Sequence, residues 1–73
     1  MNEKTEMMAD MVKNLALLLM EQDNSLTMEQ ALSIVFNSDT YRKVIDERTQ
    51  FYYQSPRYIF AFLNEELKNG KFL

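Results

Sequence analysis

Apolar residues in the first third of the chain recur every three or four positions, the spacing that places side chains on one face of an α-helix. They are Met8, Met11, Val12, Leu15, Leu18 and Leu19. Polar side chains, among them Asp10, Lys13 and Glu21, fall on the opposite face. The pattern predicts an amphipathic helix over residues 4–22 that ends at the polar run 23–25.

A second helix is predicted over residues 27–37. Thr27 and Gln30 have the three-residue spacing of a capping box, in which each side chain accepts a hydrogen bond from the other residue's backbone. The inner stripe of this helix is Met28, Ala31, Leu32 and Val35. Asn37 ends the helix, and Ser38 suits the N-cap of the next one.

The third helix is predicted over residues 39–47, with Tyr41, Val44 and Ile45 turned inward. Residues 49–54 are rich in aromatic side chains and lack helical periodicity. We therefore expect an ordered aromatic loop there, packed down by Phe51.

Ser55 followed by Pro56 predicts the start of a fourth helix, because proline suits the first helical position. This helix is predicted over residues 56–69, and Gly70 is a natural left-handed stop. The connections are short, so neighbouring helices should pack closely. We expect an all-α fold, a compact bundle of four helices in a single domain over residues 1–73.

Composition adds a constraint on stability. The 73 residues are 47% hydrophobic and include six Met, but there is no Cys and no His. A core of this size contributes only about 3–5 kcal/mol of net stability, and neither a disulfide nor a Cys or His metal site can reinforce it. We expect the reinforcement to come from self-association or from a partner protein.

The net charge of −3 and the pI of about 4.8 argue against binding to nucleic-acid phosphates, which relies on clustered Lys and Arg. No apolar run approaches the ~20 residues that span a bilayer, and the acidic start of the chain has no signal-peptide cleavage site. We expect no membrane segment and a cytoplasmic location. Met11 is an alternative start to Met1, and in that case we expect the preceding residues to be loosely held.

The sequence offers few groups for catalysis. Histidine, the usual general base, is absent. The carboxylate pairs at 46–47 and 65–66 are sequence neighbours, which point about 100° apart on a helix. A single Gly does not make a glycine-rich phosphate loop. We predict no enzyme activity, no cofactor, no metal and no small-molecule substrate.

Five residues are candidates for an interaction surface. Leu17 falls in the middle of the polar face of the first helix, with Met20 at its edge. Leu17 is either a stray surface leucine or part of a contact with a second subunit or partner. Tyr52, Tyr53 and Arg57 are residue types favoured at interfaces. Alternatively the aromatic rings cover the core, and we expect one tyrosine to be buried and the other to be free.

Arg48 and Glu66 place charges on otherwise apolar helix faces. An unpaired buried charge is very unfavourable, which leaves two arrangements open. In one, both side chains reach water near helix ends, with Arg48 extending along its apolar stem. In the other, they form an ion pair across the third and fourth helices and fix the register of the two helices.

The alternative function is DNA binding. Residues 27–37 and 39–47, joined by a short turn, have the length of a helix-turn-helix. Arg42 and Lys43 would reach the major groove, whereas Asp46 and Glu47 on the same helix would be repelled by phosphates. The signal is weaker than that for a protein-interaction module.

The chain resembles a family of small, uncharacterised bacterial all-helical proteins across residues 12–67. The segments that carry the resemblance are LTMEQALSIVFNSDTYRKVID at 26–46, T-x-x-Y-Y-Q-S-P-R-Y at 49–58 and LNEEL at 63–67. Members of such families are often encoded beside toxin-like or ADP-ribosyltransferase-like genes. The resemblance implies an antitoxin-like or accessory binding role. It assigns no functional residue. We expect the protein partner to be a second copy or the product of a neighbouring gene.

Overall fold

The longest helix, α1 (Glu3–Gln22), contacts all the other helices. The computed structural model describes residues 2–70, so Met1 and residues 71–73 of the predicted domain lie outside the described residues. The side chain of Asn2 caps α1 by accepting a hydrogen bond from the backbone N–H of Thr5 at 2.8 Å. The helix starts one residue before its predicted position and ends where predicted.

Five further elements follow α1, and the three α-helices among them start at the predicted caps. In chain order they are α2 (Met28–Phe36), α3 (Asp39–Val44), the 3₁₀ turns η1 (Glu47–Thr49) and η2 (Phe51–Tyr53), and α4 (Pro56–Asn69). Thr27 and Gln30 form the capping box of α2, while Ser38 and Ser55 cap α3 and α4. Gly70 ends α4 at φ 77°, a left-handed conformation that glycine adopts without strain. Over residues 2–70 the predicted all-α fold is confirmed.

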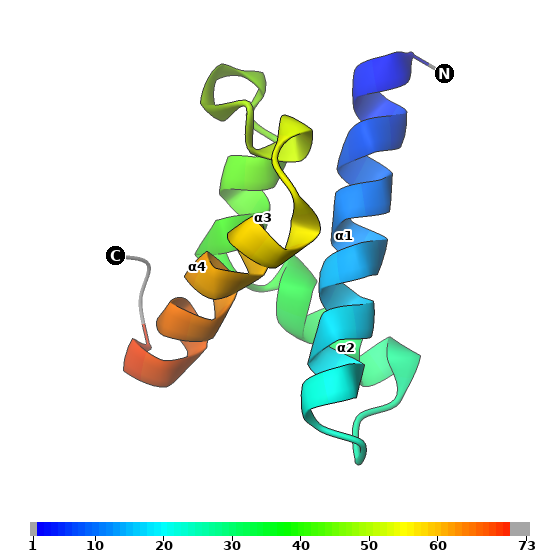
Figure 1. The fold of residues 1–73 in the computed structure, drawn as a ribbon, viewed down its shortest axis with the longest axis vertical. Coiled ribbons are helices and arrows are strands. Elements are labelled where there is room, and N and C mark those ends of the chain that lie inside the picture. Colours follow the sequence, from blue (N-terminus) through cyan, green and yellow to red (C-terminus); the bar gives the residue numbers. More distant parts are fainter. Residues whose placement is uncertain (1, 71–73) are drawn as a thin grey trace.

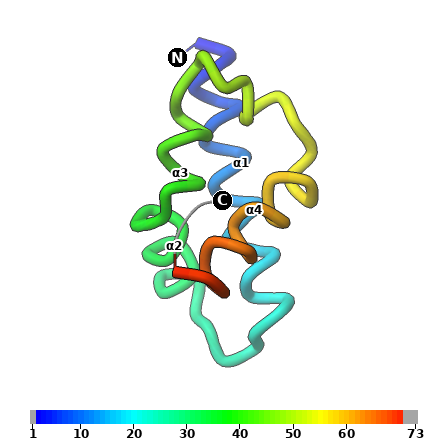
Figure 2. Tube along the Cα trace, turned by 90° about the vertical axis from the view of Figure 1, so that its left-hand side faces the viewer, coloured from blue at the N-terminus to red at the C-terminus, as the bar shows by residue number. Residues whose placement is uncertain are grey.

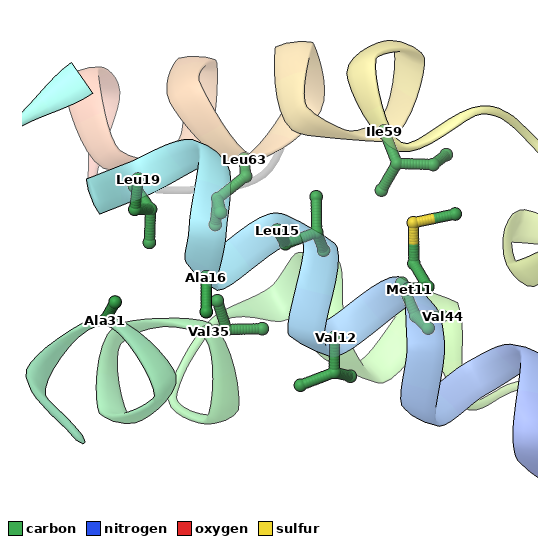
Figure 3. Close-up of a cluster of buried hydrophobic side chains, with 10 residues drawn as sticks. All are labelled: Met11, Val12, Leu15, Ala16, Leu19, Ala31, Val35, Val44, Ile59 and Leu63. Atoms are coloured by element: carbon green, nitrogen blue, oxygen red, sulfur yellow. The ribbon is translucent and has the colours of Figure 1, made fainter. Parts of the chain in front are cut away.

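The core forms around α1. Figure 1 shows α1 running along the molecule, and in Figure 2, turned by 90°, α2 and α3 lie on one side of the view while α4 crosses in front of α1. Figure 3 shows the buried side chains of α1 between Ala31 and Val35 of α2 and Ile59 and Leu63 of α4. The Cα radius of gyration is 11.5 Å, close to the value of about 11 Å for a compact chain of this length. The predicted compact bundle is therefore confirmed.

The third helix is shorter than predicted, since α3 ends at Val44 rather than at residue 47. The Asp46 side chain accepts a hydrogen bond from the backbone N–H of Arg48 at 3.0 Å, and such local bonds compete with helical pairing. The chain therefore leaves the helix and enters η1. As a result Ile45 is 46% exposed, and the prediction that it turns inward is wrong, whereas Val44 is fully buried.

Residues 49–54 form an ordered aromatic segment, as predicted, from the end of η1 and from η2. Phe51 packs against the core, and its ring centroid lies 5.4 Å from that of Phe62. Tyr52 is only 5% exposed, whereas Tyr53 is 59% exposed. One tyrosine is thus buried and the other free, as expected. The assignment of Tyr52 to an interaction surface is wrong, because its ring fills space against the core.

The buried carboxylate of Glu66 joins α4 to the first turn of α3. It accepts hydrogen bonds from the backbone N–H groups of Asp39 at 2.6 Å and Thr40 at 2.9 Å, and from the Thr40 hydroxyl at 2.7 Å. The next backbone N–H, of Tyr41, donates to the Ser38 hydroxyl oxygen at 3.0 Å. A helix leaves its first N–H groups unpaired and carries partial positive charge there. Glu66 therefore acts as an anionic cap for α3.

The predicted ion pair between Arg48 and Glu66 is wrong. The exposed guanidinium of Arg48 pairs with Asp46 at 2.9 Å, and every described hydrogen bond to the Glu66 carboxylate comes from α3. The other arrangement, with both side chains in water, holds for Arg48 but not for the buried Glu66. The charge on the inner face of α4 is compensated mainly by backbone donors rather than by a basic side chain.

We predict that Glu66→Gln lowers the free energy of unfolding by about 1–3 kcal/mol. The substitution removes the negative charge and turns an amide NH₂ group toward one of the two backbone N–H donors, which is left unpaired. The measurement is urea denaturation followed by circular dichroism. Glu65→Gln, on the exposed neighbour in α4, is the control and should change the stability by less than about 0.5 kcal/mol. Equal effects of the two substitutions would contradict the assignment of Glu66 as a cap.

Candidate functional site

An open apolar groove of about 550 Å³ lies between the N-terminal half of α1, α2 and the end of α3. The groove is lined by Thr5, Met8, Ala9, Val12 and Lys13 of α1, by Met28, Leu32 and Phe36 of α2, and by Tyr41 and Ile45 at α3. All of these side chains except Thr5 and Lys13 are apolar or aromatic. We refer to this surface as the apolar groove.

Two large side chains of the apolar groove are about half exposed. Phe36 is 51% exposed and Ile45 is 46% exposed. The ring of Phe36 meets that of Tyr41 edge to face, with the centroids 5.2 Å apart and the planes at 84°. Single exposed hydrophobic residues are ordinary, whereas these adjoin one another at a hollow, which makes the apolar groove the candidate site.

The apolar groove exists because α2 has a wider apolar face than the core covers. Ala31 and Val35 are buried in the core, whereas Met28, Leu32 and Phe36, spaced four residues apart, line the groove beside it. α3 does not cover this second stripe because it has only six residues, a length of about 9 Å. The sequence-based prediction assigns Met28 and Leu32 to the inner stripe and omits Phe36. The signal in the sequence that indicates the apolar groove is the width of the apolar face of α2.

The five predicted interaction residues do not share one surface. Leu17 and Arg57 lie together at a hollow of about 470 Å³ between α1 and the start of α4, where Arg57 makes an ion pair of 4.0 Å with α1. Met20 is partly buried and packs against the core. Tyr53 is exposed, with its ring centroid 4.7 Å from that of the buried Tyr52. None of the five lines the apolar groove.

The titratable groups with shifted pKa values lie in surface turns, and none of them lines the apolar groove. Two hydrogen bonds lower the pKa of the Asp46 carboxyl group. The larger effect comes from the Arg48 side chain and the smaller one from the Arg48 backbone N–H. The same side-chain bond raises the pKa of Arg48. The hydroxyl and backbone N–H of Ser25 lower the pKa of Asp23. These shifts follow from local hydrogen bonds that shape turns.

Residues 2–70 contain neither a cluster of acidic side chains suited to a metal ion nor a helix suited to spanning a membrane. No group of three acidic side chains in this part of the chain is placed to hold a metal ion. Within the same range, no helix combines the length and the apolar character of a membrane span. The apolar groove offers apolar contact, with the ammonium group of Lys13 as its charged member.

Comparisons with known proteins assign no family to the chain. No match was found among models of protein families, among characterised proteins or among solved structures. The resemblance to small bacterial helical proteins, and the role that it implies, stay predictions. The apolar groove is therefore interpreted from its own residues.

We predict that two isoleucines differ sharply in their contribution to stability. Ile59→Ala removes a fully buried side chain and should lower the free energy of unfolding by about 2–5 kcal/mol. Ile45→Ala removes a half-exposed side chain of the apolar groove and should cost less than about 1 kcal/mol. Urea denaturation of both variants measures the difference. A cost at Ile45 that equals the cost at Ile59 would show that Ile45 belongs to the core.

Proposed function

We propose that this protein is a non-catalytic interaction module that binds an amphipathic helix of a partner protein in the apolar groove. The supporting observation is the pair of half-exposed side chains, Phe36 and Ile45, at an open hollow whose lining is apolar except for Thr5 and Lys13. Helix-in-groove complexes use this kind of contact, because the apolar face of the bound helix leaves water as it enters the groove. A partner encoded by a neighbouring gene would agree with the antitoxin-like or accessory role that the resemblance implies.

The length of the apolar groove suits a short helical segment. Thr5 and Lys13, which line it on α1, are eight positions and about 12 Å apart along the helix. Apolar side chains at positions i, i+3, i+4 and i+7 of a bound helix span about 10 Å. Small-molecule sites, by contrast, enclose most of the surface of their ligand, whereas this hollow has half-exposed walls.

A second copy of the chain fits the apolar groove less well. A two-fold dimer joins the same patch on both subunits, so the groove would face another hollow instead of a ridge. Exposed side chains such as Leu17 and Tyr58 lie outside the groove. If they entered the groove of another copy, a two-fold dimer would close only where the reciprocal contact formed as well. We therefore assign the groove to a partner protein and self-association to the surface around Leu17.

DNA binding through α2 and α3 has less support. In helix-turn-helix proteins the first residues of the second helix meet the bases. The first turn of α3 instead bonds to the Glu66 carboxylate, whose charge would repel phosphates. In addition, α3 has only six residues, and its Arg42 pairs with Asp39.

We predict that the protein binds a designed helical peptide with leucines at i, i+3, i+4 and i+7 and polar residues elsewhere. Phe36→Gln should weaken this binding at least about tenfold, since a central aromatic anchor contributes about 2 kcal/mol or more. Fluorescence anisotropy of the labelled peptide measures the affinity. Chemical shifts of the labelled protein locate the contact, which should include Met8, Leu32 and Ile45.

Tyr58→Gln is the matched control for this experiment. Tyr58 is 55% exposed, much like Phe36, but it lies on α4 outside the apolar groove. Absence of binding, or equal weakening by the two substitutions, would contradict the proposal. Sedimentation of the protein alone tests the rival occupant: a dimer that Phe36→Gln dissociates would place a second copy in the groove. A dimer that only Leu17→Glu dissociates would place self-association on the other surface.

A further inference from the structure

The charged member of the apolar groove, Lys13, has no described ion-pair partner. Its side chain is exposed and lines the groove. The ion pairs found within residues 2–70 involve other basic side chains, namely Lys4, Arg42, Arg48 and Arg57. The ammonium group is therefore available to a bound molecule.

Two other basic side chains near the apolar groove already form ion pairs. Lys4, next to Thr5 at one end of the groove, pairs with Glu47 at 3.9 Å. Arg42 of α3 pairs with Asp39. Asp10, one turn before Lys13 on α1, is exposed but does not line the groove. Although the chain as a whole carries a net charge of −3, the groove therefore has a positive group at Lys13.

We infer that the helix bound in the apolar groove carries a carboxylate that pairs with Lys13. The inference rests on the proposed function and specifies the chemistry of the partner. An ammonium group and a carboxylate form a charge-assisted hydrogen bond, and the low-dielectric surface of an apolar groove strengthens it. An acidic amphipathic helix is thus preferred to a basic one.

The position of Lys13 also indicates which end of the bound helix carries the carboxylate. The ion pair between Lys4 and Glu47 brings the start of α1 close to the chain that follows Ile45, so Ile45 marks the Thr5 end of the groove. Lys13 lies two helical turns away along α1. The apolar side chains of the partner contact Phe36 and Ile45, and its carboxylate lies at the opposite end.

The test uses two designed helical peptides that share the leucine pattern and differ only in one flanking residue, Glu or Lys. At low ionic strength the unmodified protein should bind the Glu peptide about two- to fivefold more tightly than the Lys peptide. Lys13→Glu should reverse this preference. The preference should shrink toward unity in 1 M NaCl, where charges are screened over about 3 Å.

Lys68→Glu, on an exposed position of α4, is the matched control and should keep the original preference. Equal affinities for the two peptides, or a preference that Lys13→Glu leaves unchanged, would overturn the inference. If both peptides bind and Phe36→Gln still weakens their binding, the result excludes the acidic partner but not the proposed function. If neither peptide binds, the proposed function fails together with it.

Discussion

The hydrogen bonds between Glu66 and the first turn of α3 support the geometry on which the apolar groove depends. α3 has six residues, far fewer than the ~12–15 that give an isolated helix marginal stability, so its surroundings must hold it. Glu66 satisfies two of its free N–H groups, and Val44 anchors its other end in the core. Tyr41 and Ile45, which line the groove, are positioned by this short helix. The buried carboxylate of Glu66 on α4 therefore helps to shape the apolar groove, although the Glu66 side chain does not line it.

Local signals predicted the starts of α2, α3 and α4 correctly because capping depends on residues that are close in sequence. Thr27 and Gln30 form their capping box whatever lies around them, and Ser55 followed by Pro56 starts α4 in the same way. Such local signals could not identify the partners of Glu66, because these partners lie 26 and 27 residues away in the sequence. Its position on an apolar face indicated a charge in need of compensation, and the predicted partner was a basic side chain. The actual donors are largely backbone N–H groups, which a charge pattern does not reveal.

The apolar groove escaped prediction for a related reason. An apolar pattern tells which side chains avoid water but not which element covers them. Val35 and Phe36 are adjacent on the apolar side of α2, and one is fully buried while the other is half exposed. The difference depends on where α3 ends, and that in turn depends on the turn formed by Asp46 and Arg48. Candidate surface residues taken from breaks in the pattern, such as Leu17, thus identified a different hollow from the one that the fold leaves apolar.

The distance in sequence between the two halves of the α3 cap bears on how the chain matures during synthesis. Thr40 and Glu66 are 26 residues apart, an interval that a ribosome takes about 1–5 s to translate. Local helices form within microseconds, so α1 and α2 have ample time to pair before the cap exists. For those seconds the nascent chain presents the α1–α2 face without the short helix that completes one side of it. The apolar groove therefore reaches its folded form only after Glu66 has been synthesised.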